Sequence, residues 1–289
     1  MRALHCIAAA GSTGEVPLES LIYILLALFG LLFGSFANVV IWRFPRGESL
    51  SHPGSHCPVC QGPIAWYDNI PVVSWLVLGG RCRLCATPIS ARYPVVELLS
   101  AALWVLAGVL FGLSLQMVAA VFFFYLLLIL SFIDLDLRRL PNGLVGLLFG
   151  VGVIGVLTSQ LTRFEALPLL SGGGGVWGEP VVFAGIGAVA ASGVMLVIAL
   201  VYERFRHTQG LGMGDIKLLA VMGLYLGLYA LLALFCATLL GAAYGLIAAR
   251  AKGGSLRTAL PFGPFLAAGS ILTTAFGPAA WTWYLALLK

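Results

Sequence analysis

The stretch LQMVAAVFFFYLLLILSFI, residues 115–133, decides the class of fold, and DLDLRRLPN follows it directly at residues 134–142. The first stretch carries no charged residue and matches the roughly 20-residue apolar helix that crosses a bilayer. It therefore predicts a transmembrane helix that ends against acidic residues. Similar stretches predict eight spans in all, at 20–42, 94–112, 115–133, 143–161, 181–202, 216–229, 230–249 and 260–286.

The composition excludes a soluble protein on separate grounds. Of 289 residues, 61% are hydrophobic and 9% are charged, whereas soluble domains carry about 25% charged residues. A soluble fold of this size leaves roughly a quarter of its unfolded-chain surface exposed, and so apolar a chain cannot cover that surface with polar groups. Disordered proteins and disulfide-stapled secreted proteins are excluded as well. The sequence thus predicts an all-α, polytopic membrane protein.

The sixth and seventh predicted spans are short. Lys217 and Arg250 bound the segment that contains both of them, so two crossings there must be short or tilted. A single long re-entrant segment is the alternative for this stretch.

The basic residues predict the orientation, because cytoplasmic loops of membrane proteins collect Lys and Arg. With the N-terminus outside, all of the 16 basic residues except Arg2, Arg163 and Lys289 fall in inside segments. The positive net charge therefore reflects orientation and does not indicate a nucleic-acid partner. The predicted division is an external tail at 1–19, a first transmembrane helix at 20–42, a cytoplasmic domain at 43–93 and a transmembrane core at 94–289.

Four cysteines in the predicted cytoplasmic domain indicate a metal site. They form the pairs Cys57-Pro-Val-Cys60 and Cys82-Arg-Leu-Cys85, a spacing close to that of zinc ribbons. Each pair aims two thiolates at one ion, and two pairs complete a tetrahedral site. A domain of about 50 residues has too small a core to fold without such a staple. We predict a small zinc-ribbon-like domain between the first and second transmembrane helices, with a structural Zn²⁺.

Two disulfides, or four reduced thiols, are the alternatives for these cysteines. The reducing cytoplasm disfavours disulfides, so the choice depends on the predicted orientation. His52 and His56 are further candidate ligands, although the four cysteines complete a site by themselves.

Two of the 11 acidic residues stand at matching membrane boundaries: Asp134 ends the span at 115–133, and Asp215 opens the span at 216–229. Two crossings separate them, so the topology places both at the same face and at similar depth. Acidic residues in a membrane are costly and indicate function. A pair that shares one proton is able to activate water against a peptide carbonyl and to protonate the leaving amine. Pairing with neighbouring basic residues, as boundary anchors, is the alternative.

Small and acidic neighbours refine this candidate site. Gly212 and Gly214 precede Asp215 and would let a substrate backbone or another helix approach it closely. Asp136 cannot face the same partner as Asp134, because the two positions differ by about 200° around a helix axis. Asp134 adjoins the apolar run and is the better candidate, whereas Asp136 is expected at the mouth of the site.

Taken in order along the chain, these motifs resemble those of bacterial type IV prepilin peptidases. The resemblance runs from the first span to the last. It departs at Asn142, where many members carry Asp, but that position is not one of the catalytic pair. The shared motifs are Gly34-Ser-Phe-Ala-Asn38 with Arg43, the two Cys-x-x-Cys pairs, Arg92-Tyr-Pro94-Val-Val-Glu97, the Asp-x-Asp segment with Leu-Pro, the Gly-x-Gly-Asp segment, and Pro261-Phe-Gly-Pro264.

The resemblance implies an aspartyl peptidase of the Gly-x-Gly-Asp type in the bacterial inner membrane, with Asp134 and Asp215 as its catalytic pair. It implies that the enzyme cuts the basic leader from a prepilin or pseudopilin at the cytoplasmic face, for type IV pili or type II secretion. It further implies methylation of the new N-terminus with S-adenosylmethionine, and it links Gly80 to that activity. A plain turn at Gly79-Gly80 is the alternative for this glycine pair.

Two other functional classes remain open. A polytopic transporter would combine a cytoplasmic zinc domain with acidic residues used for proton coupling, although transporters place their sites near the membrane midplane. A non-enzymatic assembly platform would leave the glycine-flanked Asp215 unexplained. Membrane lipid is a partner in every case, and the sequence indicates no particular oligomeric state.

Overall fold

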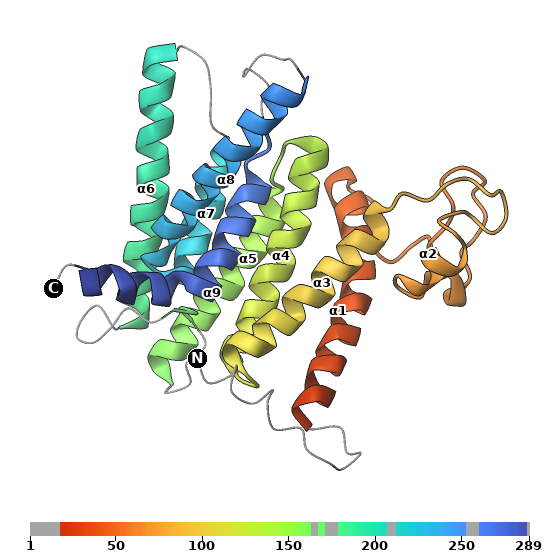
Figure 1. Cartoon of the computed structure of the whole chain (residues 1–289), viewed down its shortest axis with the longest axis horizontal. Helices are drawn as coiled ribbons and strands as arrows, with labels where there is room; N and C mark the ends of the chain where they lie inside the picture. Colours follow the sequence, from red (N-terminus) through yellow and green to blue (C-terminus); the bar gives the residue numbers. More distant parts are fainter. Residues whose placement is uncertain (1–17, 163–166, 171–178, 207–211, 253–259, 288–289) are drawn as a thin grey trace. The chain divides into compact units, whose positions relative to one another are not determined.

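The computed structural model describes residues 18–162, 167–170, 179–206, 212–252 and 260–287. Within these ranges the chain is helical, with turns and two isolated β-bridges but no strand, which confirms the predicted all-α class. The predicted external tail at 1–19 lies, up to residue 17, outside the described residues. The chain separates into two compact units, Met1–Leu113 and Ser114–Lys289 (Figure 1).

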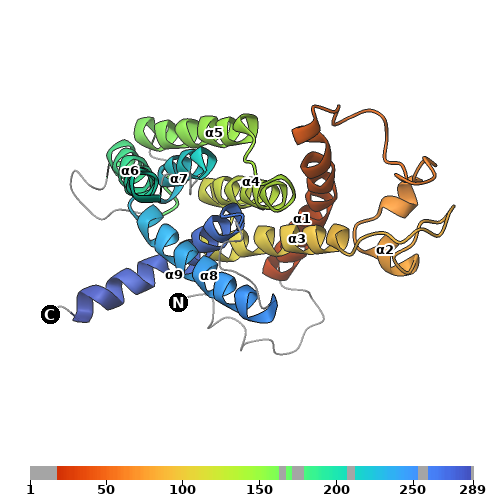
Figure 2. The same cartoon turned by 90° about the horizontal axis from the view of Figure 1, so that it is seen from above.

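The first unit is built on two long helices, α1 (Leu18–Arg43) and α3 (Arg92–Phe111), which pack along each other. Glycines on α1 permit this packing: a Cβ at Gly30 would lie 2.5 Å from the Cα atom of Ala101, and a Cβ at Gly34 would lie 2.6 Å from the Cα atom of Glu97. Small residues are a usual means by which membrane helices approach closely. Figure 2 shows this pair from above, with α2 to one side of it.

The segment between α1 and α3 contains only short helices. These are η2 (Phe44–Arg46), η3 (Trp66–Asn69) and α2 (Val73–Val77). The predicted domain at 43–93 therefore coincides with the part of the first unit that lacks long helices. Because the compact unit also includes α1 and α3, the boundaries of a separate domain stay a prediction.

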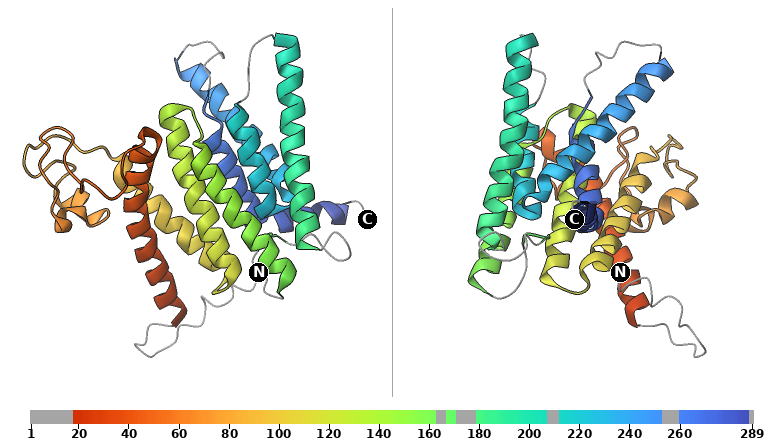
Figure 3. Two further views of the ribbon diagram at one scale, coloured as in Figure 1. Left: turned by 180° about the vertical axis from the view of Figure 1, so that it is seen from behind. Right: turned by 60° about the vertical axis from the view of Figure 1, so that its left-hand side comes forward.

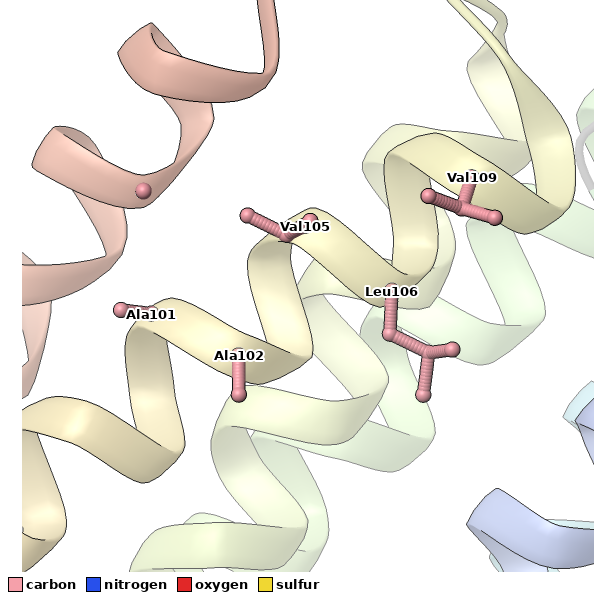
Figure 4. A pocket seen from close by; sticks show the side chains of 6 residues that line it. Ala101, Ala102, Val105, Leu106 and Val109 are labelled. Atoms are coloured by element: carbon pink, nitrogen blue, oxygen red, sulfur yellow. The ribbon is translucent and has the colours of Figure 1, made fainter. Parts of the chain in front are cut away.

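One face of the α1–α3 pair carries a shallow hollow (Figure 4), and no polar side chain lines it. The hollow suits hydrocarbon and offers no chemistry. Its lining residues are Ala27, Ala101, Ala102, Val105, Leu106 and Val109.

The second unit is a helical bundle, shown from two further sides in Figure 3. Its central helix is α7, which contacts α5, α6, α8 and α9. Tyr225 of α7 is fully buried, and its hydroxyl donates a hydrogen bond to the backbone oxygen of Leu148 at 2.9 Å. The bundle comprises α4 (Leu115–Leu137), α5 (Asn142–Leu161), α6 (Pro180–Arg206), α7 (Met213–Leu226), α8 (Tyr229–Lys252) and α9 (Gly263–Leu287).

Each of the eight predicted spans coincides with a helix in the described ranges. Six of the helices are long and apolar enough to cross a membrane, namely α1, α3, α4, α5, α6 and α8. Helix α7 has 14 residues and is about 21 Å long, short of the roughly 30 Å of a bilayer core. Helix α9 contains Pro278. The number of crossings therefore stays a prediction.

The stretch 216–249 is divided between two helices and is not one continuous helix. Helices α7 and α8 meet at Gly227, whose positive φ of 58° favours glycine. The backbone N–H of Gly227 closes the last turn of α7 on the oxygen of Gly223. The short stretch between Lys217 and Arg250 therefore accommodates parts of two helices by means of a sharp turn.

Candidate active site and metal centre

Asp134 lies inside the last turn of α4. The helix continues past the predicted end at residue 133 to Leu137, and the backbone N–H of Arg138 then closes it on the oxygen of Asp134 at 2.9 Å. The Asp134 side chain is only 6% exposed. Its Oδ2 atom accepts a 2.9 Å hydrogen bond from the backbone N–H of Gly263. The position of this carboxyl group is therefore fixed by two elements, the end of α4 and the start of α9.

Asp215 lies in the first turn of α7 and is partly exposed. The tight turn before it is closed by its own backbone N–H, which donates to the oxygen of Gly212 at 3.0 Å. The charge of Asp134 acts on the Asp215 carboxyl group. The second unit thus brings together, within electrostatic range, the two acidic residues that the sequence analysis paired.

The glycines near Asp215 have different roles. A Cβ at Gly214 would lie 3.2 Å from the Cβ atom of Leu140, so this glycine admits the segment after α4. A Cβ at Gly212 would lie 3.3 Å from Oδ2 of Asp215 itself. Close approach at Gly214 is therefore made by the side chain of Leu140, while Gly212 leaves room around the carboxyl group.

Gly263 is the site residue that the sequence analysis missed. A Cβ at this position would lie 2.9 Å from Oδ2 of Asp134, in the place that the hydrogen bond needs. The residue is 129 positions away from Asp134 in the sequence, so no local pattern connects them. The only signal was the Pro261-Phe-Gly-Pro264 motif, which the resemblance included without a role.

Asp136 and Asn142 lie at the periphery of the pair. Asp136 is exposed, on a different side of α4 from the buried Asp134. Asn142 begins α5 and accepts a 3.2 Å hydrogen bond through Oδ1 from Nζ of Lys217 on α7. Asn142, which stands where many members of the resembled family carry Asp, therefore links α5 to the helix that carries Asp215.

The arrangement of the pair suits acid–base chemistry. Two carboxyl groups within electrostatic range do not both ionise cheaply, so they hold one proton between them. The start of α9 presents a backbone N–H and the positive end of a helix dipole to Asp134. Both features favour the ionised form of Asp134, so we expect the shared proton on Asp215.

The four predicted cysteine ligands form one cluster in the first unit. The Sγ atoms of Cys57, Cys60, Cys82 and Cys85 all lie within 4.8 Å of one another, and those of Cys57 and Cys85 are 3.8 Å apart. Tetrahedral thiolates on a metal with bonds of about 2.3 Å are separated by about 3.8 Å. The cluster therefore fits a metal ion such as zinc. Within the described ranges His52 and His56 are not part of it.

Two equivalent turns shape this cluster. In the first, the N–H of Cys57 donates to the oxygen of Gly62, and in the second, the N–H of Cys82 donates to the oxygen of Thr87, both at 2.9 Å. Gln61 and Ala86 occupy corresponding left-handed positions, each with a φ of 56°. The same turn geometry thus occurs at both cysteine pairs, and it directs all four Sγ atoms toward one point.

The electrostatics of the thiols are compatible with a bound cation. The side chain and backbone of Thr87 lower the pKa of the Cys85 thiol to about 6. The backbone N–H of Gly62 acts to lower the pKa of Cys60, but burial and the neighbouring thiols outweigh it and raise that pKa to about 11. Thiols this close cannot all ionise alone, whereas a bound metal ion ionises them together.

A hydrogen-bonded pair links the second turn to η3. Arg83 donates to both carboxylate oxygens of Asp68, at 2.7 and 2.6 Å. These hydrogen bonds and the charge of Arg83 hold the pKa of Asp68 below its usual range. The pair helps to order the segment around the cysteines.

Gly80 occupies a turn that requires glycine. Its φ is +67°, and that of Gly79 is +59°. A Cβ at Gly80 would lie 2.9 Å from the ring of Trp75, whose Nε1 donates to the oxygen of Ile89 at 3.1 Å. The turn and the ring contact account for the glycine, and a link to methylation stays a prediction.

Comparisons with known proteins agree with this layout. The family model described as bacterial peptidase A24 N-terminal domain matches residues 28–111, and the model of the type IV leader peptidase family matches residues 121–246. The two matches fall on either side of the division between the compact units at Leu113 and Ser114. No solved structure matches the chain.

Several curated relatives cover most of the chain, and each is named a prepilin leader peptidase/N-methyltransferase. The relative from Aeromonas hydrophila is 36% identical over 92% of this chain and 94% of its own length. The relative from Klebsiella pneumoniae is 39% identical over 71% and 86%, and that from Bacillus subtilis is 35% identical over 90% and 97%. With both units matched and relatives this similar over nearly their full length, the chain belongs to the type IV leader peptidase family.

Proposed function

We propose that this protein is a multi-pass inner-membrane aspartyl peptidase that removes the leader of a prepilin or pseudopilin and methylates the new N-terminus. The names of the relatives support both activities. The observation that carries the peptidase assignment is that Asp134 and Asp215 lie within electrostatic range of each other. The relatives' names do not favour a transporter, and a membrane-boundary pair of acids is explained by peptide hydrolysis without proton coupling.

In this proposal Asp134 is the base and Asp215 is the acid. Asp134 takes a proton from a water molecule, whose oxygen attacks the carbonyl carbon of the scissile peptide. Asp215 gives its proton to the leaving nitrogen as the C–N bond breaks. The hydrogen bond from Gly263 supports the ionised starting state of Asp134. The pair ends the reaction with its proton on Asp134, and exchange with solvent through the partly exposed Asp215 restores the starting state.

The substrate and the site share one membrane face in this proposal. A basic leader stays in the cytoplasm by the same preference that keeps Arg and Lys in cytoplasmic loops. The apolar helix behind the leader enters the bilayer, which leaves the cleavage point at the boundary. Asp134 is at the end of α4 and Asp215 at the start of α7, and in this proposal both helix ends stand at that boundary. The cytoplasmic side is therefore the side on which we expect cleavage.

Zinc and S-adenosylmethionine complete the proposal. Cys57, Cys60, Cys82 and Cys85 would hold one structural Zn²⁺ and so order the segment between α1 and α3. S-adenosylmethionine supplies the methyl group for the new N-terminal amine. Among the residues of this chain, Gly80 is the position that we connect with methylation, through the resemblance alone.

A cleavage assay tests the catalytic pair. Purified protein in detergent is incubated with a prepilin, and the rate of leader loss is followed by gel shift or mass spectrometry. Asp134→Asn and Asp215→Asn should each reduce this rate by about 10²- to 10⁴-fold, because each removes one partner of the proton transfer. Asp136→Asn is the matched control on the same helix, and it should cleave at nearly the unchanged rate.

Two outcomes would contradict the assignment. One is normal cleavage by either variant of the pair. The other is an equal loss in the Asp136→Asn control, which would point to a general effect of charge at the end of α4. Unfolding of each variant in detergent, followed by circular dichroism, separates loss of chemistry from loss of fold.

A further inference from the structure

The short helix α2 presents an apolar face that the described residues of the first unit leave exposed. Val73, Leu76 and Val77 are 52%, 64% and 74% exposed. Their spacing of three and four residues places them on one side of the helix. Single exposed apolar residues are ordinary on protein surfaces. Three exposed apolar side chains on one side of a five-residue helix form a continuous apolar surface. In a membrane protein such a surface is stable against an apolar environment.

A hydrogen bond fixes the depth of this helix. The backbone N–H of Val72, directly before α2, donates to Oε2 of Glu97 at 2.7 Å. Glu97 is 7% exposed and follows Arg92, the first residue of α3, by five positions, or about 7.5 Å along the axis. Helix α3 has the length and composition of a membrane span from Arg92 onward. The start of α2 is therefore tied to the membrane-spanning part of α3.

The views of the first unit agree with this depth. In Figures 1 and 3, α2 lies level with a part of α1 that precedes its end, not beyond that end. That end of α1 carries Trp42, 52% exposed, with the Arg46 guanidinium 3.7 Å from its ring centre. Tryptophan and arginine are typical of the boundary between lipid and water. Trp42 and Arg46 thus mark the lipid–water boundary at the end of α1, and α2 lies at that level or deeper in the membrane.

The opposite side of α2 is fixed by the segment that carries it. The hydroxyl of Ser74 donates to the oxygen of Tyr67 at 2.9 Å, and Nε1 of Trp75 donates to the oxygen of Ile89 at 3.1 Å. Five residues are too few to form a stable helix alone. These bonds therefore hold α2 in place and set which side chains face outward, and the outward side chains are the apolar ones.

We propose that α2 inserts its Val73, Leu76 and Val77 face among the lipids of the leaflet that holds the end of α1 and the start of α3. The cysteine-bearing segment is then attached to the bilayer through α2. The neighbouring Trp66, 80% exposed, and Tyr67 supply the aromatic rings that favour the headgroup level. The occupant is the lipid itself, because α2 is anchored through Val72 to Glu97 of the membrane helix α3, and Glu97 packs against Gly34 of α1.

Photo-crosslinking of the full chain in lipid nanodiscs tests this proposal. Benzoylphenylalanine replaces Leu76 in one variant and Val59 in the other, and the nanodiscs contain phosphatidylcholine and phosphatidylglycerol. Val59 is the matched control, because it is an apolar residue in the same segment with the same exposed fraction of 64%. After irradiation, mass spectrometry should find phospholipid adducts at position 76 at least about tenfold more often than at position 59.

Three outcomes would overturn the proposal. They are adducts at position 76 to peptides from residues 114–289, adducts to a second copy of the chain, and equal lipid labelling at positions 76 and 59. Both substituted side chains are exposed, so neither substitution removes core packing. Elution of each variant as a single peak in size-exclusion chromatography checks the fold. The readout does not involve cleavage, so its failure is distinct from a failure of the proposed function.

Discussion

At the scale of single residues, the position of the Asp134 carboxyl group depends on a backbone donor far along the chain. Gly263 gives its N–H to Oδ2 of Asp134, and both atoms are buried. A side chain at position 263 would compete with the carboxyl group for the same space, since its Cβ would lie 2.9 Å from that oxygen. Glycine is therefore required here by a close approach, not by an unusual φ angle.

Gly263→Ala should lower the turnover number for leader cleavage more than it changes KM. A hydrogen bond to a charged group contributes about 1.5–3 kcal/mol, which corresponds to about 10- to 100-fold in rate. Steady-state kinetics with a prepilin peptide measure this effect. Gly146→Ala on α5 is the control, because a Cβ there meets nothing within 4 Å. Unchanged turnover in the Gly263 variant would remove the role of this donor.

At the scale of helices and turns, the sequence predicted where helices form, which depends on composition. It missed where α4 ends, which depends on contacts with a distant part of the chain. Every apolar stretch became a helix, because the membrane requires internal hydrogen bonding of each backbone group. The end of α4 was placed at residue 133 because Asp134 is polar, yet the helix continues to Leu137. Burial against α9 and the bond from Gly263 accommodate the charge, and neither is visible in a local pattern.

The cysteine turns were predictable for the opposite reason. Two residues between cysteines determine a local turn, and the same backbone geometry recurs at Gln61 and Ala86. The hydrogen bond from Val72 to Glu97 was not predictable, because it joins residues 25 positions apart. Sequence analysis gave Glu97 no role, whereas the structure shows it as the anchor of α2.

The cysteine cluster should bind one metal ion per chain. Elemental analysis of the purified protein should give about one Zn²⁺ per chain, and the double variant Cys57→Ser with Cys60→Ser should lose it, because two of four ligands are gone. Cys236→Ser is the control, since Cys236 lies on α8 outside the cluster. A double variant that keeps its full metal content would exclude the four-thiolate site.

At the scale of the whole molecule, two questions of topology remain predictions: which side the site faces and how many helices cross. The basic residues favour a cytoplasmic position for the ends of α1 and α4. Six helices meet the length and composition of a span, and the sequence predicts eight crossings. Both numbers are even, so the position of the C-terminus does not distinguish them. The loop between α7 and α8 does.

Reporter fusions at two positions answer both questions together. Alkaline phosphatase is active only outside the cytoplasm, and green fluorescent protein fluoresces when it folds inside. After Arg139, beyond α4, the fluorescent fusion should be bright and the phosphatase fusion inactive. After Leu228, beyond α7, the phosphatase fusion should be active, because α7 then completes a crossing despite its 14 residues. Such a short helix needs a locally thinned bilayer or apolar residues of neighbouring helices to cover the remaining depth. Inactive phosphatase after Leu228 would show that α7 enters the membrane without crossing it, and active phosphatase after Arg139 would place Asp134 on the outer side, away from the basic leader.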